Sequence, residues 1–272
     1  MAIRKKGEIS FLTFSIFENL PVKAAVSCRT GGVSQPPFDS LNMGLHVGDE
    51  AKDVLENRRR YGEALGISAD SLINCCQVHG THIEEVSAKD CGRGALSLAS
   101  AIPGTDGLAT AEPLVPLTMN YADCTPLFFY DPLRKVSVLA HGGWRGTAGN
   151  IAGKAVRFME AHYHSESQNI LAAIGPAIGF SDFEVGNDVV EEMKTLFDER
   201  EFSFLFRKKE GDKYLFNLPE ANHRLMRKAG IREEHIEDCH ISTWERKDLF
   251  YSYRREKGRT GRHMAVLMME SE

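Results

Sequence analysis

The sequence predicts an α+β fold in which mixed β-sheets form a sandwich with flanking helices, within a single domain over residues 1–272. Short apolar segments typical of strands alternate irregularly with amphipathic segments typical of helices, and no strand–helix–strand unit repeats at a regular spacing. This irregular order argues against an all-parallel sheet. No linker or internal repeat interrupts the chain, and 42% of its residues are hydrophobic, which is enough for one large core.

The first elements are a strand and a helix joined by a polar loop. A strand is predicted at residues 22–28, and residues 40–49 form a loop rich in small and hydrogen-bonding side chains. Loops of this composition commonly shape a pocket or cap a helix. Asp49 is predicted to cap a helix from about Ala51 to Leu65, which Gly66 ends.

That helix carries three consecutive arginines, Arg58, Arg59 and Arg60. Consecutive helical residues point about 100° apart, so at most one or two of the three face a shared anion. We expect the others to lie on a solvated face.

The remaining elements follow from apolar periodicity and from glycine and proline positions. They are a mobile loop at 92–101, a turn at 105–108, a helix from Ile151 to His162, a strand at 170–174, a helix at 189–197, a helix that begins at Pro219 and ends at Gly230, and a closing pair of strands at 248–253 and 262–269.

The stretch from Leu117 to Asn150 combines the features of a site. A short strand around 117–120 runs into Asp123 and Cys124, and a β-branched strand at 136–140 is followed directly by His141. Two glycines, Trp144, Arg145 and Gly146 come next, and then a helix. Because backbone N–H groups are free where a helix begins, this turn brings a thiol, an imidazole and a guanidinium beside anion-binding backbone.

Three residues in this region are candidate metal ligands: His79, Cys124 and His141. Two imidazoles and a thiolate suit Zn²⁺, and three protein ligands leave a fourth position for water or substrate. The residues alone leave two alternatives open. The side chains can be structural, or Cys124 and His141 can act as nucleophile and base, as in cysteine hydrolases.

Composition excludes several classes of function. The formal net charge of −5 gives no basic surface for nucleic acid or anionic membrane. No apolar run approaches the roughly 20 residues of a membrane-spanning helix, and no signal-peptide core follows the first residues. The six cysteines are irregularly spaced, which predicts free thiols. We therefore expect a cytoplasmic protein with no nucleic acid, membrane or protein partner.

A set of motifs along nearly the whole chain resembles one family, the bacterial multicopper polyphenol oxidase or laccase-domain proteins. The motifs are RTGGVSQPPFDSLNMGLHVGDE, ENRRR, QVHG, DGLAT, ADCTPL, AHGGWRG, GPAIG, FEVG and YSYRREKGRTGR. Members of the family include purine nucleoside phosphorylases and the peptidoglycan editing factor. QVHG, ADC and HxGWRG together are specific, whereas any one of them alone is not.

The resemblance implies that the family's zinc ligands fall on His79, Cys124 and His141, in a mixed α/β sandwich. It implies phosphorolysis of adenosine, inosine, guanosine and S-methyl-5'-thioadenosine, with adenosine deamination as a second activity. Candidate catalytic residues are then the three ligands and Arg145, and candidate substrate-binding residues are Asn42, Arg58, Gln77 and Arg145. Purine nucleosides and phosphate are the expected substrates.

Three departures from the family pattern bear on function. Gly142 replaces the usual alanine, which we expect to be harmless, and Thr125 replaces leucine. Ala177 replaces a frequent cysteine, which removes a soft ligand that a copper oxidase could use.

Among polar residues, Arg145 is the candidate holder of phosphate, because Gly143 and Gly146 leave room for an anion. Asp123 is expected to be structural unless the strand has already turned there. Two other functions stay open. One is a peptidoglycan precursor editing amidase, and the other is a copper-dependent polyphenol oxidase (laccase).

Overall fold

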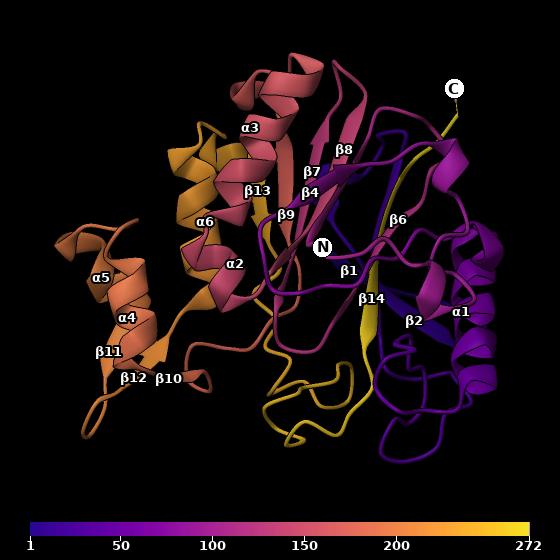
Figure 1. Cartoon of the computed structure of the whole chain (residues 1–272), viewed down its shortest axis with the longest axis horizontal. Helices are drawn as coiled ribbons and strands as arrows, with labels where there is room; N and C mark the ends of the chain where they lie inside the picture. Colours follow the sequence, from indigo (N-terminus) through magenta and orange to yellow (C-terminus); the bar gives the residue numbers. More distant parts are fainter. Residues whose placement is uncertain (272) are drawn as a thin grey trace.

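The computed structural model describes residues 1–271, and two large sheets form its centre (Figure 1). The first sheet is antiparallel throughout. Its strand order is β1 (Ala2–Lys6), β2 (Ile9–Thr13), β3 (Val22–Ser27), β14 (His263–Met269) and β6 (Leu117–Tyr121).

The second sheet is mixed, because both of its outermost pairs are parallel and its inner pairs are antiparallel. Its strand order is β13 (Ile236–Asp238), β9 (Leu171–Ile174), β7 (Thr125–Asp131), β8 (Val136–Gly142), β5 (Gly107–Thr110) and β4 (Ile83–Glu85). Together the two sheets confirm the predicted class, an α+β sandwich of mixed sheets.

Strand β14 shows why the sheets stack as they do. Successive strand residues point to opposite faces. Ala265 and Leu267 pack into the core between the two sheets, whereas Met264 and Val266 pack on the outer face against Tyr61. Tyr61 belongs to α1 (Ala51–Leu65), which covers that face of the five-stranded sheet (Figure 1).

Helices also cover the outer face of the six-stranded sheet. Helix α3 (Ile151–Tyr163) and helix α6 (Leu218–Lys228) pack there on the apolar side chains of β7, β8 and β9 (Figure 1). The order of layers is therefore helix, sheet, sheet, helices. Strands β14, β6, β7 and β8 are buried along their whole length, which removes apolar sheet surface from water, whereas the edge strand β1 is largely exposed.

A small sheet extends from the helical side, at the left of Figure 1. It contains β10 (Glu184–Gly186), β12 (Lys213–Phe216) and β11 (Phe206–Lys208), with α4 (Asn187–Met193) and α5 (Glu199–Leu205). Phe183, Val189 and Phe216 from this region share a hydrophobic core with α3 and α6. This shared core supports the prediction of a single domain.

Several predicted elements need correction. Residues 248–253 form turns and no strand, because their backbone bonds locally: Glu256 N donates to the carbonyl of Ser252, and Gly258 N to that of Tyr253. Helix α1 has the predicted bounds, but Glu50 occupies its cap position. The Asp49 carboxylate instead accepts hydrogen bonds from Ser34 and Asn42.

The predicted turn at 105–108 ends earlier than expected, because Gly107 and Leu108 begin β5. All six cysteines are free thiols, as predicted. Within residues 1–271, no helix combines the length and apolarity needed to cross a bilayer.

Candidate metal centre and its cavity

The fold brings His79, Cys124 and His141 together. One ligand atom from each lies within 4.8 Å of the others. His141 is carried by β8, Cys124 follows the end of β6, and His79 lies in a loop with a left-handed φ of 61°. The hydroxyl of Tyr121 donates to the carbonyl of Ala140 at 3.0 Å, which ties β6 to β8 beside the cluster.

Asp106 organises this cluster, and sequence reasoning missed it. Its fully buried carboxylate accepts hydrogen bonds from the backbone N–H groups of Val78 (3.1 Å), His79 (3.0 Å) and Gly80 (2.7 Å). It also pairs with Nδ1 of His141 at 2.8 Å. The available signal was an acidic residue directly before a buried strand, which resembled an ordinary Asp-Gly turn.

Because an ionised carboxylate only accepts, Nδ1 of His141 carries a proton and Nε2 is left for a metal. Burial raises the pKa of the Cys124 thiol, but the facing imidazoles of His141 and His79 outweigh burial and lower that pKa overall. Burial lowers the pKa of His141, and Cys124 and Asp106 reverse this and raise it. The cluster therefore favours the thiolate, the form of cysteine that binds metal ions.

Gly143 gives the cluster its space. A Cβ at this position would lie 3.0 Å from Cδ2 of His79 and 3.1 Å from the sulfur of Cys124. The corresponding contacts of Gly146 are the carbonyls of Gly80 and His141, at 3.0 and 3.1 Å. The room for an anion predicted at Gly143 and Gly146 stays a prediction, because these contacts concern only an added Cβ.

We expect Gly143→Ala to lower the retained metal by about 10-fold or more, since the new methyl group displaces two ligands. Elemental analysis of the purified variant measures this directly. Gly186→Ala serves as the control, because its φ of −87° suits alanine and its Cβ would meet only the Asp188 side chain, outside the cluster and the cavity. Equal metal content in Gly143→Ala and wild-type protein would contradict the assignment.

The cluster opens onto a cavity of about 510 Å³. Gln77 and Arg145, both predicted for the site, line it, and so do the unpredicted residues Arg254 and Arg262. The other lining residues are His46, Cys75, Cys76, Leu98, Asn120, Tyr121, Ala122, Asp123, Trp144, Ile178, Phe183, Leu218 and Tyr253, besides the three cluster residues. A volume of this size suits a small-molecule ligand.

The cavity residues predicted from the sequence differ in what their side chains do. Arg145 is exposed and its guanidinium lies 4.3 Å from the centre of the Trp144 ring. The amide of Gln77 bonds the backbone of Asn120 in both directions, at 3.0 and 2.9 Å, so it fixes the loop that carries His79. Helix α2 (Trp144–Ala148) has only five residues, so its N-terminus adds little to anion binding.

Asn42 and Arg58, the other two candidate substrate-binding residues, do not line this cavity. The buried Arg58 donates to the carbonyls of Met43, Gly94 and Ala95, which joins two loops. Asn42 accepts from the backbone N–H of Arg262 at 2.8 Å. Both therefore shape walls behind the cavity.

Asp123 has turned away from the strand direction, with a φ of 91°. Its carboxylate accepts from the hydroxyl of Thr243 at 2.6 Å and from the backbone N–H of Arg254 at 2.7 Å. The chain has therefore turned at Asp123, the condition under which the sequence left another role open, and the carboxylate anchors the loop that carries Arg254.

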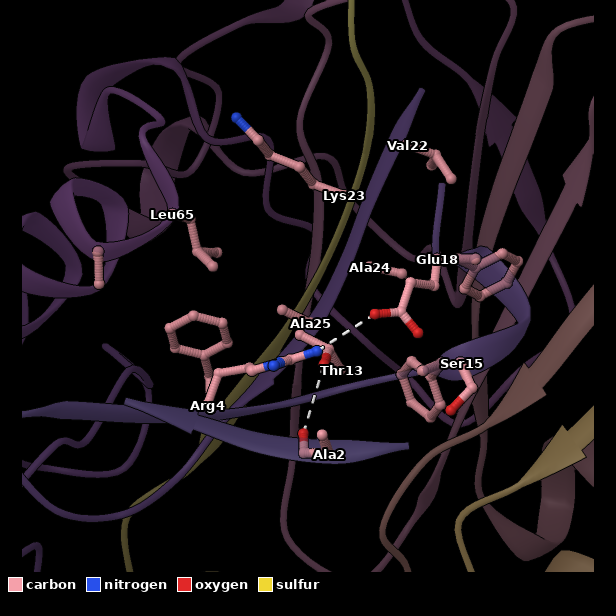
Figure 2. Close-up of a pocket in the computed structure, with 14 residues that line it drawn as sticks. Ala2, Arg4, Thr13, Ser15, Glu18, Val22, Lys23, Ala24, Ala25 and Leu65 are labelled. Atoms are coloured by element: carbon pink, nitrogen blue, oxygen red, sulfur yellow. Dashed lines mark hydrogen bonds and ion pairs between the residues drawn. The ribbon is translucent and has the colours of Figure 1, made fainter. Parts of the chain in front are cut away.

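A second hollow, of about 340 Å³, lies between the first three strands and the end of α1 (Figure 2). Its charged side chains are paired: Arg4 with Glu18 at 3.4 Å, and Lys23 with Glu270 at 3.2 Å. In the large cavity, by contrast, Arg145, Arg254 and Arg262 form no ion pair with any carboxylate of residues 1–271.

Comparison with known proteins agrees with the fold and with the family resemblance of the sequence. The sequence profile of the family "Multi-copper polyphenol oxidoreductase laccase" matches residues 23–270. "Purine nucleoside phosphorylase YlmD" of Geobacillus stearothermophilus is 41% identical over 249 residues, which cover 92% of this chain and 90% of the relative. The protein of the same name from Bacillus subtilis is 34% identical, with 93% and 90% covered.

Two crystal structures show the same fold. YlmD from Geobacillus stearothermophilus superposes with a TM-score of 0.93 at 38% identity, over 99% of each chain. Bacillus licheniformis hypothetical protein YfiH also gives 0.93, at 34% identity, over 98% of this chain and 99% of that one. With a profile match over most of its length and relatives above 30% identity, this chain belongs to the multi-copper polyphenol oxidoreductase laccase family.

Proposed function

We propose that this protein is a zinc-dependent purine nucleoside phosphorylase that acts on adenosine, inosine, guanosine and S-methyl-5'-thioadenosine and also deaminates adenosine. The observation that carries the proposal is the His79–Cys124–His141 cluster, held by Asp106 beside a cavity with unpaired arginines. The name of the relatives, purine nucleoside phosphorylase, supports the same reaction class.

The donor set fits zinc. Two imidazoles and a thiolate are zinc ligands, the Asp106–His141 hydrogen bond is the usual support of a ligating histidine, and Gly143 keeps the centre of the cluster open. A bound zinc ion supplies Lewis acidity toward water or a substrate oxygen. We propose His79, Cys124 and His141 as its ligands.

In phosphorolysis a phosphate oxygen forms a bond to C1′ of the ribose while the C1′–N9 bond breaks. The bonding electrons leave with the purine, which takes up a proton. The protein must therefore hold an anion beside a sugar carbon that becomes positive. Arg145 is proposed to bind this phosphate, because it lines the cavity and its guanidinium, which lies over the Trp144 ring, has no hydrogen bond or ion pair within residues 1–271.

Supplying adenosine to the metal-loaded protein with and without phosphate tests the function. We expect adenine and ribose 1-phosphate only when phosphate is present, and slow inosine formation without it. Base release that is independent of phosphate would contradict phosphorolysis. Copper-dependent phenol oxidation faster than nucleoside turnover would favour the laccase alternative.

Arg145→Lys tests the anion contact within this function. We expect phosphorolysis to lose about 1.5–3 kcal/mol of transition-state stabilisation, because lysine cannot make a bidentate contact with phosphate. Deamination should change much less, since it uses no phosphate. Steady-state rates of both reactions on the same preparation, with metal content as the control, measure the contrast. Equal loss of both activities would place Arg145 outside phosphate binding.

One observation favours a second function. Cys124, His141 and Asp106 also have the order of a nucleophile, a base and an orienting carboxylate. Without metal, this arrangement suits amide hydrolysis, the chemistry of a peptidoglycan precursor editing amidase. Hydrolysis of a muramyl peptide by chelator-treated protein, lost on adding zinc, would favour this alternative.

A further inference from the structure

The large cavity has a cationic lining that its carboxylates do not neutralise. Asp123 is the sole carboxylate among the described residues that line it, and its oxygens already accept from Thr243 and Arg254. Arg254 donates from Nη1 to the carbonyl of Glu184 at 2.9 Å, so part of its guanidinium is in use. Arg145 and Arg262 remain as the guanidinium groups most available to a ligand.

The guanidinium of Arg262 is oriented in a particular way. Its Nη1 donates to the carbonyls of Thr260 at 2.9 Å and Gly261 at 3.0 Å. No acceptor within residues 1–271 bonds its Nε or Nη2, which together form the edge that binds phosphate bidentately. Tyr253 lies under the guanidinium, at 5.5 Å from the ring centre.

The backbone of Arg262 is fixed from two sides. Its N–H donates to Oδ1 of Asn42 at 2.8 Å, and its carbonyl accepts from the N–H of Met43 at 3.0 Å. Asn42 is itself held by Asp49 at 2.8 Å. Because side-chain freedom lost on binding weakens affinity, a guanidinium held in this way binds an anion better than a mobile one.

Gly44 adds a steric constraint on the same side chain. A Cβ at this position would lie 2.9 Å from Cγ of Arg262 and 3.2 Å from Cε1 of His46. The loop at 40–49 therefore leaves only enough space for the Arg262 side chain to pass into the cavity. Arg262 lines the same cavity as His79, Cys124 and His141.

We propose that Arg262 is a second anion-binding residue which, with Arg145, binds the phosphate nucleophile of phosphorolysis, and that Asn42 and Gly44 position it. This inference rests on the proposed function. It also gives a role to Asn42, which was expected to touch substrate, as a residue that acts through Arg262. In the reaction the Nε–Nη2 edge holds two phosphate oxygens and leaves a third free to attack C1′.

The test measures binding of inorganic phosphate to metal-loaded protein by equilibrium dialysis without nucleoside, followed by the KM values for phosphate and adenosine. We expect Arg262→Gln to raise both the dissociation constant and the KM for phosphate by about 10-fold or more. The KM for adenosine and the metal content should change less than about twofold. Arg262→Lys should give an intermediate value, because it keeps the charge and loses the bidentate edge.

Arg207→Gln is the matched control, because Arg207 also lies over an aromatic ring, Phe180 at 5.3 Å, but outside the cavity. Its phosphate affinity should equal that of the wild type. Unchanged phosphate affinity in a folded, metal-loaded Arg262→Gln protein would overturn the inference.

Gly44→Ala decides between the two outcomes if Arg262→Gln fails to fold, since it keeps the guanidinium and presses most closely on the stem of Arg262. A raised KM for phosphate at an unchanged KM for adenosine supports positioning, and no change in phosphate affinity overturns it. The inference and the proposed function fail separately. If phosphate binding depends on Arg262 but no nucleoside is turned over, the proposed function is wrong and the inference stands. If phosphorolysis occurs and its KM for phosphate does not depend on Arg262, the inference is wrong and the proposed function stands.

Discussion

Cys124→Ala is expected to reduce bound metal from about one ion per chain to a small fraction, and nucleoside turnover with it. Three side chains form the cluster, and removal of one leaves two imidazoles, of which His79 is exposed. A change in the outer support of a metal ligand costs 10–100-fold in affinity, so loss of a ligand itself should cost more than about 100-fold. Elemental analysis after dialysis measures the effect.

Cys76→Ala is the matched control for Cys124→Ala. Cys76 is also a free thiol that lines the cavity, but it does not belong to the cluster. Its replacement should leave metal content unchanged. If Cys124→Ala retains a full complement of metal, the ligand assignment is wrong and the Cys124–His141 nucleophile interpretation gains support.

Asp106→Asn should weaken metal binding by about 10–100-fold and lower the free energy of unfolding by roughly 2–4 kcal/mol. The fully buried carboxylate of Asp106 accepts from three backbone N–H groups and from His141. An amide of the same shape presents its NH₂ group to at least one of these donors, which leaves a buried donor unpaired. Thermal or denaturant unfolding and metal titration check both effects.

Asp131→Asn separates the metal effect from the loss of a buried carboxylate. Asp131 is also buried and accepts from backbone N–H groups, those of Leu133 at 2.9 Å and Arg134 at 3.1 Å. It lies at the end of β7 and does not line the cavity. We expect Asp131→Asn to lower the free energy of unfolding and to leave metal affinity unchanged. Equal metal affinity in Asp106→Asn and wild-type protein would show that Asp106 does not support the metal ligand His141.

The local parts of the fold were predictable from the sequence. Helix α1 has the predicted bounds and ends at Gly66, which adopts a left-handed φ of 70°, and β8 follows from a β-branched run. Strand β7 was missed, because it is buried along its whole length and so shows no alternation of apolar and polar residues. Its proline at position 126, next to its first residue, also argued against a strand.

The distant contacts of the site were not predictable in this way. The three cluster residues were named from their chemistry and from a family resemblance, whereas Asp106 resembled a turn residue until its four donors were visible. Arg262 closes the motif YSYRREKGRTGR, but the sequence did not place it in the cavity, because its partner Asn42 is 220 residues away. Gly143 was assigned to an anion because the sequence shows that a glycine is present but not which side chains approach it.

The position of β14 has a consequence for how the protein folds during its synthesis. This strand lies inside the five-stranded sheet, between β3 and the edge strand β6, and the N–H of Met264 donates to the hydroxyl of Ser27 across 237 residues. Until the ribosome has made residues 263–269, β3 and β6 have no partner between them and expose unpaired edges. Pairing over such separations is slow. The nascent chain therefore completes this sheet, and the cavity wall that Arg262 provides, only late in synthesis. Until then the exposed strand edges can pair with other chains, so the unfinished protein is prone to aggregation.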